Sequence, residues 1–134
     1  MPQTKLAKLQ SLQNAAARIV TLTGKYSHIT PILKSLHWLP IEQRTKYKML
    51  LSVFHCVQGS APQYNVSLIN AYNPTRLLRS ADSGFLVVPA CTKSWGERAF
   101  ARAGPSLWNS LPFSLRNVSS KESFKIELKT HLFS

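Results

Sequence analysis

Acidic side chains are the residues most able to support metal-dependent chemistry, because two neighbouring carboxylates can hold a pair of catalytic metal ions. This chain of 134 residues has five of them: Glu42, Asp82, Glu97, Glu122 and Glu127. No two are adjacent in sequence, and none lies between two predicted strands. We therefore expect no two-metal catalytic site in this chain.

The other reactive residue types form no recognisable catalytic or metal-binding pattern. The two cysteines, Cys56 and Cys91, are far apart, and no Cys-x-x-Cys or His/Cys zinc spacing occurs. The five glycines are scattered, and no nucleophile motif of the Gly-x-Ser-x-Gly type is present. His55 precedes Cys56, but adjacent residues on a helix point in different directions. We interpret Cys56 as a buried, reduced thiol, and predict no catalytic residue, no metal and no cofactor.

The charge of the chain is strongly unbalanced, with 17 Lys and Arg against 5 Asp and Glu, a net charge of +12. Such an excess favours a polyanionic partner, either the RNA or DNA backbone or an anionic membrane surface. The alternative is a basic surface that binds nothing. No apolar run approaches the length of a membrane span, and no signal peptide is visible, so we expect no membrane partner and an intracellular location, nuclear or cytoplasmic.

Three pairs of basic residues are candidates for binding a phosphate backbone without base specificity. The pairs are Arg44 with Lys48, Arg76 with Arg79, and Arg98 with Arg102. Arginine side chains suit phosphate oxygens, and Trp95, one turn before Arg98, could stack on a base. Each pair could equally be a solvated surface. The pair Arg76 and Arg79 is the most informative, because a loop offers few packing reasons for two arginines. Arg116 is assigned to an exposed turn outside this set.

Helices are predicted to position most of these side chains. Apolar periodicity predicts a helix over 5–23 that ends at Gly24. Its expected buried arc is Leu6, Leu9, Leu12, Ala16, Ile19 and Val20, with Gln10, Ser11, Asn14, Arg18 and Thr21 on the opposite side. A short helix over 31–37 with Thr30 as N-cap and a longer helix over 41–58 should follow.

The second half of the chain is predicted to be less regular. A short helical segment over 62–69 leads into a polar loop over 70–84. Residues 85–88 should form a strand, for which 91–95 could supply a hairpin partner. Two short helices, 96–103 and 105–111, are expected on either side of a break at Gly104 and Pro105. A capping box at Ser119 and Glu122 predicts a last helix to about Leu132.

These elements predict a mainly α fold: one small irregular helical domain over 1–134 with one short β-hairpin. The tryptophans Trp38, Trp95 and Trp108 are interpreted as core residues rather than base-stacking platforms, with Trp108 beside Phe100. Gly104 and Pro105 are interpreted as a structural joint before Trp108.

Several short motifs occur in an order typical of one protein family. They are 12–20, 28–41, 44–51, 59–64, 78–80, 86–89, 96–100, 104–112, 123–125 and 128–133. Taken together they resemble the C-terminal region of reverse transcriptases encoded by LINE-type retrotransposons, in the jockey-like and CR-one groupings. The resemblance runs nearly end to end, and it rests on the order and spacing of the motifs.

The resemblance implies a larger parent protein with an endonuclease and an RNA-directed DNA polymerase ahead of this region. Neither catalytic part is present, so it implies no enzyme activity for this chain. It implies that the region binds template RNA or target DNA and braces the polymerase core. Residues 91–93 lack the basic run common in the family. Two other roles stay open: a domesticated protein-interaction module with apolar docking faces, and a pseudogene remnant without function.

Overall fold

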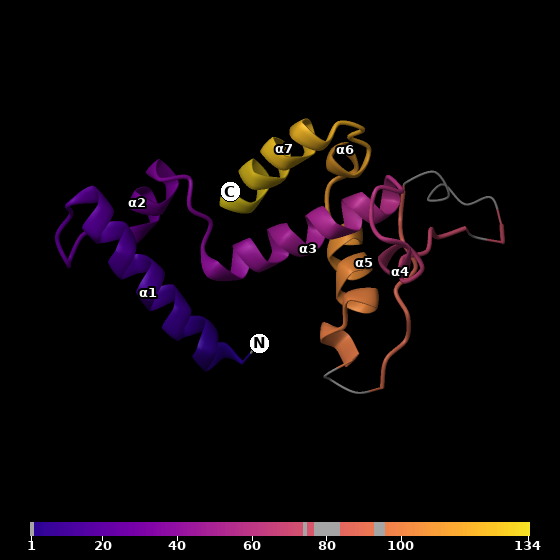
Figure 1. The fold of residues 1–134 in the computed structure, drawn as a ribbon, viewed down its shortest axis with the longest axis horizontal. Coiled ribbons are helices and arrows are strands. Elements are labelled where there is room, and N and C mark those ends of the chain that lie inside the picture. The colour runs from indigo at the N-terminus through magenta and orange to yellow at the C-terminus, as the bar shows by residue number, and fades with distance from the viewer. Residues whose placement is uncertain (1, 74, 77–83, 93–95) are drawn as a thin grey trace. The chain divides into compact units, whose positions relative to one another are not determined.

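The computed structural model describes residues 2–73, 75–76, 84–92 and 96–134, which are mainly helical (Figure 1). This confirms the predicted mainly α class. The helices are α1 Gln3–Thr21, α2 Ile29–Ser35, α3 Ile41–Val57, α4 Gln63–Val66, the 3₁₀ turn Gly96–Arg98, α5 Phe100–Ser110, α6 Phe113–Arg116 and α7 Lys121–Phe133. They form two compact units, residues 1–47 with 129–134 and residues 48–128.

The first unit is built around α1 and α2. Its core is formed by Ala17 of α1 with Ile32 and Leu33 of α2, and Trp38 packs against this cluster while partly buried. Trp38 therefore lies at the edge of this core. A cluster this small buries little apolar surface, so hydrogen bonds to the surrounding chain become important for holding α1 in place.

The buried face of α1 is the opposite of the one predicted. Ala17 is fully buried, whereas Leu12, Ile19 and Val20 are 68%, 73% and 60% exposed. The polar side of the helix, including Gln10, faces the rest of the unit. Periodicity identified which residues share a face, but polar contacts decide which face is covered.

The ends of α1 and α2 also differ from those predicted. The residue after α1 is Leu22, which takes a left-handed conformation with φ 54°, so the helix ends before Gly24. Its backbone N–H donates to the carbonyls of Arg18 and Ile19, which satisfies the helix end. Helix α2 begins at Ile29, so the N-cap is His28 and not Thr30.

The second unit is organised by aromatic side chains from three helices. Phe54 of α3 stacks on Phe124 of α7, with ring centroids 4.3 Å apart. The ring of Trp108 from α5 lies 5.8 Å from that of Phe124. Trp108 is 1% exposed, which confirms its predicted core position, and its indole N–H donates to the carbonyl of Gly84 at 3.0 Å. These ring contacts join α7 to the C-terminal part of α3, and α5 to α7.

Helix α5 continues through Gly104 and Pro105, so the predicted break there is wrong. Proline removes one backbone donor and normally destabilises a helix interior. Here Gly104, Pro105 and Trp108 are all buried, and the packing of this face holds the helical conformation. Gly104 is needed for that packing, because a Cβ on it would lie 2.9 Å from Cγ2 of Val53.

The predicted strand over 85–88 is reduced to an antiparallel bridge between Leu86 and Ala71. Its partner is therefore not the segment 91–95, of which 93–95 lie outside the described residues. Asn109 of α5 reinforces the bridge, since its side chain accepts from the Leu86 N–H at 2.8 Å and donates to the Leu86 carbonyl at 2.9 Å.

Candidate functional site

Arg44 and Lys48, the first predicted pair, both lie exposed on α3, four residues apart. Glu42 stands in the first turn of this helix and pairs with Lys46 at 3.0 Å. The side chain of Arg44 makes no hydrogen bond or ion pair with any residue that the structure describes. Arg44 is therefore a cation that remains available to an external anion, whereas Lys46 is already paired.

The second predicted pair falls mostly outside the structure. Arg76 is exposed, and Arg79 lies outside the described residues, as does Trp95. The structure therefore supports the accessibility of Arg76 only.

The third pair does not share one helix, contrary to the prediction. Arg98 ends the 3₁₀ turn and is exposed, whereas Arg102 belongs to α5. The Arg102 guanidinium donates to the carbonyl of Pro89, which holds the segment before the turn against α5. Arg102 therefore has a structural contact, and the described residues show no counterpart of it at Arg98.

Arg116 is not the exposed turn residue that the sequence suggested. Its guanidinium donates to the backbone carbonyls of Asn109 and Leu111, and it lies 4.4 Å from the centroid of the Phe85 ring. It therefore joins the end of α5 to α6 and to the segment around the bridge. The pattern gave no sign of this role, because carbonyl contacts leave no trace in residue spacing.

Two glutamines of α1 fix the segment between α2 and α3 in the first unit. The Gln13 side chain donates to the carbonyl of Leu39 at 2.8 Å, and the Gln10 side chain accepts from the N–H of Ile41 at 2.8 Å. Both partners flank Pro40, where the chain turns into α3. These bonds place the start of α3 opposite α1.

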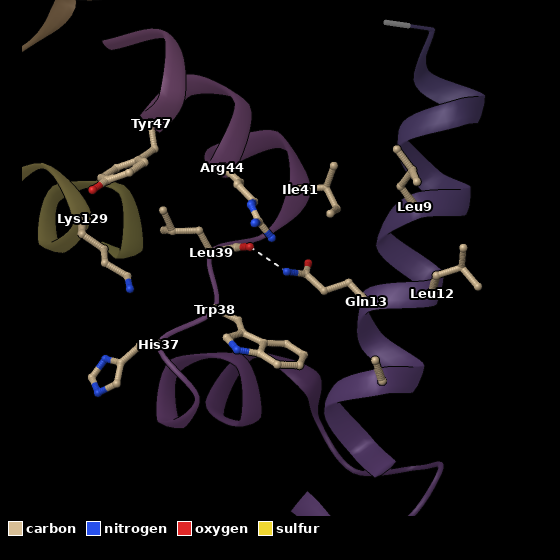
Figure 2. A pocket seen from close by; sticks show the side chains of 11 residues that line it. Leu9, Leu12, Gln13, His37, Trp38, Leu39, Ile41, Arg44, Tyr47 and Lys129 are labelled. Carbon is tan, nitrogen blue, oxygen red and sulfur yellow. Dashed lines mark hydrogen bonds between the residues drawn. The ribbon is translucent and has the colours of Figure 1, made fainter. Parts of the chain in front are cut away.

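A groove of about 610 Å³ lies in the first unit between α1 and the segment that leads into α3 (Figure 2). Its lining residues are Leu9, Leu12, Gln13, Ala16, His37, Trp38, Leu39, Ile41, Arg44, Tyr47 and Lys129. The set is mainly apolar, with two permanent cations and no carboxylate. Figure 2 shows Arg44 reaching from α3 toward the side of α1 that carries Gln13.

This groove was missed in the sequence because its residues come from four separate segments. Arg44 was predicted to bind phosphate, and the groove now gives it an apolar neighbourhood. Lys129 was not singled out, since the helix spacing of α7 does not reveal that it belongs with residues near α1. The apolar residues that α1 leaves uncovered become visible only in the folded chain, so the sequence offers no signal for the groove.

A second basic cluster, also missed, lies in the other unit around His55. The Nδ1 atom of His55 is 2.9 Å from the Ser60 hydroxyl. Partial burial, and then the positive charges of Lys121 and Lys125, lower the pKa of His55 below 6.5. The 121/125 spacing on one helix was available in the sequence, but its position beside α3 was not.

Two observations concern the reactive side chains of the described residues. These residues contain no group of three His, Cys, Asp or Glu side chains that could hold a metal ion. Burial raises the pKa of the Cys56 thiol, which disfavours the reactive thiolate. What the arrangement can do chemically is bind anions through exposed cations and apolar groups through the groove.

Comparisons with protein-family models, with curated proteins and with solved structures find no match to this chain. Within the described part of the chain, no helix has the length and apolar character needed to cross a membrane.

Proposed function

We propose that this chain is a non-catalytic C-terminal piece of a LINE-type retrotransposon reverse transcriptase that binds RNA or DNA backbones without sequence specificity. In the parent protein it would also brace the polymerase core. The observation that carries the binding proposal is the excess of exposed cations, of which Arg44 has no anionic partner among the described residues. The ordered motifs of the sequence support the family origin.

The excess of positive charge is largely left unpaired when the chain folds, which favours binding to a polyanion. With 17 basic and 5 acidic residues, few cations can be neutralised internally, and Lys46 with Glu42 is the ion pair found among the described residues. Exposed charges left without partners repel one another, and a polyanion relieves that repulsion. Arg44 and Lys48 are both exposed and lie four residues apart on α3, so they are the pair that we propose contacts phosphates.

A salt titration tests this proposal. Binding of a short RNA and of a short DNA duplex is measured by fluorescence anisotropy at several salt concentrations. If phosphates are contacted, log affinity falls linearly with log salt, with a slope of about −0.9 per contact on duplex and about −0.7 on single strands. Replacing Arg44 and Lys48 by Ala should make the slope less steep by up to the value expected for about two phosphate contacts.

Lys46→Ala is the matched control, because it removes the same type of charge from the same helix at a position that is already paired. It should change the slope less than either Arg44→Ala or Lys48→Ala. Absence of binding to both nucleic acids at low salt would refute the proposal and leave the remnant interpretation. Template-dependent nucleotide incorporation by the purified chain with magnesium or manganese would refute its non-catalytic part.

A second candidate function, a protein-interaction module, is favoured by a different observation. The apolar face of α1 is exposed and continues into the groove.

A further inference from the structure

The apolar face of α1 has the spacing of a helix-packing seam. Leu9, Leu12, Ala16 and Ile19 follow one another at intervals of three, four and three residues, which places them in one row along the helix. Leu12 and Ile19 are 68% and 73% exposed, so their own unit leaves this row uncovered. The row is ~15 Å long at 1.5 Å per residue, enough to cover almost three turns of a second helix.

The groove lies beside the N-terminal part of this row. Leu9, Leu12 and Ala16 line it from α1. Trp38 and Ile41 line it from the other side (Figure 2). Its volume of about 610 Å³ accommodates several large apolar side chains. The small side chain of Ala16 in the middle of the row permits a partner helix to approach closely.

Charge selects among the possible occupants. Residues 1–47 hold seven Lys and Arg and a single acid, Glu42, which is paired with Lys46. Arg44 and Lys129 line the groove, and no carboxylate does. A second copy of this chain would bring like charge against like charge, and a nucleic acid would place phosphates along an apolar row that offers them no donor. A helix with apolar residues flanked by acidic ones could pack on the row and also pair its carboxylates with Arg44 and Lys129.

We propose that the groove and the apolar row of α1 bind an acidic amphipathic helix of a partner protein. Its apolar side chains lie on Leu9, Leu12, Ala16 and Ile19, and one of them enters the groove beside Trp38. Its carboxylates lie against Arg44 and Lys129. Apolar burial supplies most of the affinity, and the charges select the acidic partner.

The test uses a fluorescein-labelled helical peptide of about 16 residues, ~24 Å in length, with leucines at three- and four-residue spacing and glutamates beside them. We expect saturable binding to the full chain by anisotropy. A peptide with lysine in place of each glutamate, and one with serine in place of each leucine, should bind at least about tenfold more weakly, each through loss of one of the two contributions.

Two variants locate the site. Leu12→Gln should lower the affinity for the glutamate peptide about tenfold or more, since it removes one of the apolar side chains on which the peptide packs. Ile126→Gln is the matched control, because Ile126 is also 68% exposed on a helix but belongs to the other unit. It should leave peptide affinity unchanged, and circular dichroism should show both variants folded. Replacing Arg44 and Lys129 by Gln should remove most of the preference for glutamate over lysine.

Three kinds of result would overturn the proposal. The first is a failed peptide test, in which the glutamate peptide does not bind or binds no better than its lysine version. The second is a concentration-dependent dimer in sedimentation velocity that Leu12→Gln abolishes, which would assign the row to a second copy. The third is an RNA that displaces the peptide and whose own affinity falls in the Leu12→Gln variant, which would assign the groove to nucleic acid. Because Leu12 carries no charge, backbone binding of RNA elsewhere should survive its replacement.

Discussion

The side-chain amide of Gln13 donates to the carbonyl oxygen of Leu39 at 2.8 Å, across 26 residues of chain. This bond joins the middle of α1 to the residue before Pro40, where the chain turns toward α3. Together with the bond from the Ile41 N–H to Gln10, it explains why α1 presents its polar side to its own unit. The apolar row of α1 is exposed as a direct consequence.

Replacing Gln13 by Ala should therefore loosen α1. The Leu39 carbonyl loses its donor, and the cost should be about 1–3 kcal/mol if that carbonyl stays shielded from water. Hydrogen exchange should become faster in α1 and at the start of α3. Gln3→Ala, at the exposed first residue of α1, is the control and should leave exchange unchanged. Unchanged protection in the Gln13 variant would show that the bond contributes nothing in solution.

Trp108 should be the most costly single aromatic to remove. It is 1% exposed, lies against Phe124, and donates its indole N–H to Gly84. Truncation of a large buried aromatic leaves a cavity, so Trp108→Ala should reduce the free energy of unfolding by about 3–5 kcal/mol. Urea unfolding followed by circular dichroism measures this loss. Tyr26→Ala, at a 94% exposed aromatic, should have almost no effect, and equal losses in the two variants would reject the core assignment.

Gly104 tests the continuous α5 helix. Alanine usually stabilises a helix relative to glycine, by about 0.5–1 kcal/mol. At Gly104, however, the new Cβ would lie 2.9 Å from Cγ2 of Val53, a stiff and fully buried side chain. We expect overpacking to dominate and Gly104→Ala to destabilise the protein by about 1–3 kcal/mol.

Gly24→Ala provides the contrast. The nearest atom to its Cβ would be the Ser27 hydroxyl oxygen at 4.0 Å, so its effect on unfolding should stay within about 0.5 kcal/mol. If Gly104→Ala were instead stabilising, α5 could not pack as closely on α3 as the structure has it.

His55 should make stability depend on pH on the acidic side. Its pKa is lowered in the folded chain by burial and by Lys121 and Lys125, whereas the unfolded chain has the ordinary value near 6.5. Between these two values the unfolded state binds the proton more readily, so stability falls as pH decreases from 6.5 toward the folded pKa. Above 6.5 both states are neutral at this site and the effect vanishes.

An NMR titration of His55 checks the cause directly. Replacing Lys121 and Lys125 by Gln should raise its pKa toward 6.5 and reduce the acid-side loss of stability, although the part due to burial should remain. His55→Gln should remove the pH dependence that this residue contributes. An unchanged His55 pKa in the lysine variant would show that the two charges do not act on the imidazole.

The contrast between α1 and α7 shows what the sequence could predict. In α7 the sequence spacing of Phe124, Leu128 and Leu132 predicts one apolar stripe, and the first two of these side chains are fully buried while Leu132 is partly buried. In α1 the apolar spacing predicts the helix correctly, but it predicts the wrong buried face. Its position depends on the hydrogen bond from Gln13 to a backbone carbonyl 26 residues away. Every residue has a backbone carbonyl, so no pattern of residue types can indicate which one accepts this bond.

Pro105 shows the same limit in α5. The local rule that proline ends a helix failed because burial of Gly104 and Trp108 on one face outweighs the loss of one backbone bond. For the candidate site, the sequence correctly indicated Arg44 as exposed, since a basic residue on a helix surface needs only local information. The groove beside it required four segments to come together, and no short-range pattern encodes that.

The loop arginines give the last prediction. Arg76 is exposed and Arg79 follows it three residues later. If this loop contacts phosphates, replacing both by Ala should flatten the salt dependence of RNA and DNA binding by about one to two units and weaken all sequences alike. The Arg116 variant is unsuitable as a control, because that side chain donates to the carbonyls of Asn109 and Leu111 and its loss would disturb the fold.

A double replacement of Lys5 and Lys8 is the better comparison, since it removes two charges from exposed positions on α1. A larger flattening for Arg76 and Arg79 would place the loop in contact with the backbone. Equal flattening in both double variants would attribute the effect to net charge alone, because a diffuse field responds to the number of cations and not to their position. Slopes identical to that of the unmodified protein in the arginine variant would remove the loop from the binding surface and leave the exposed cations of α3 as its centre.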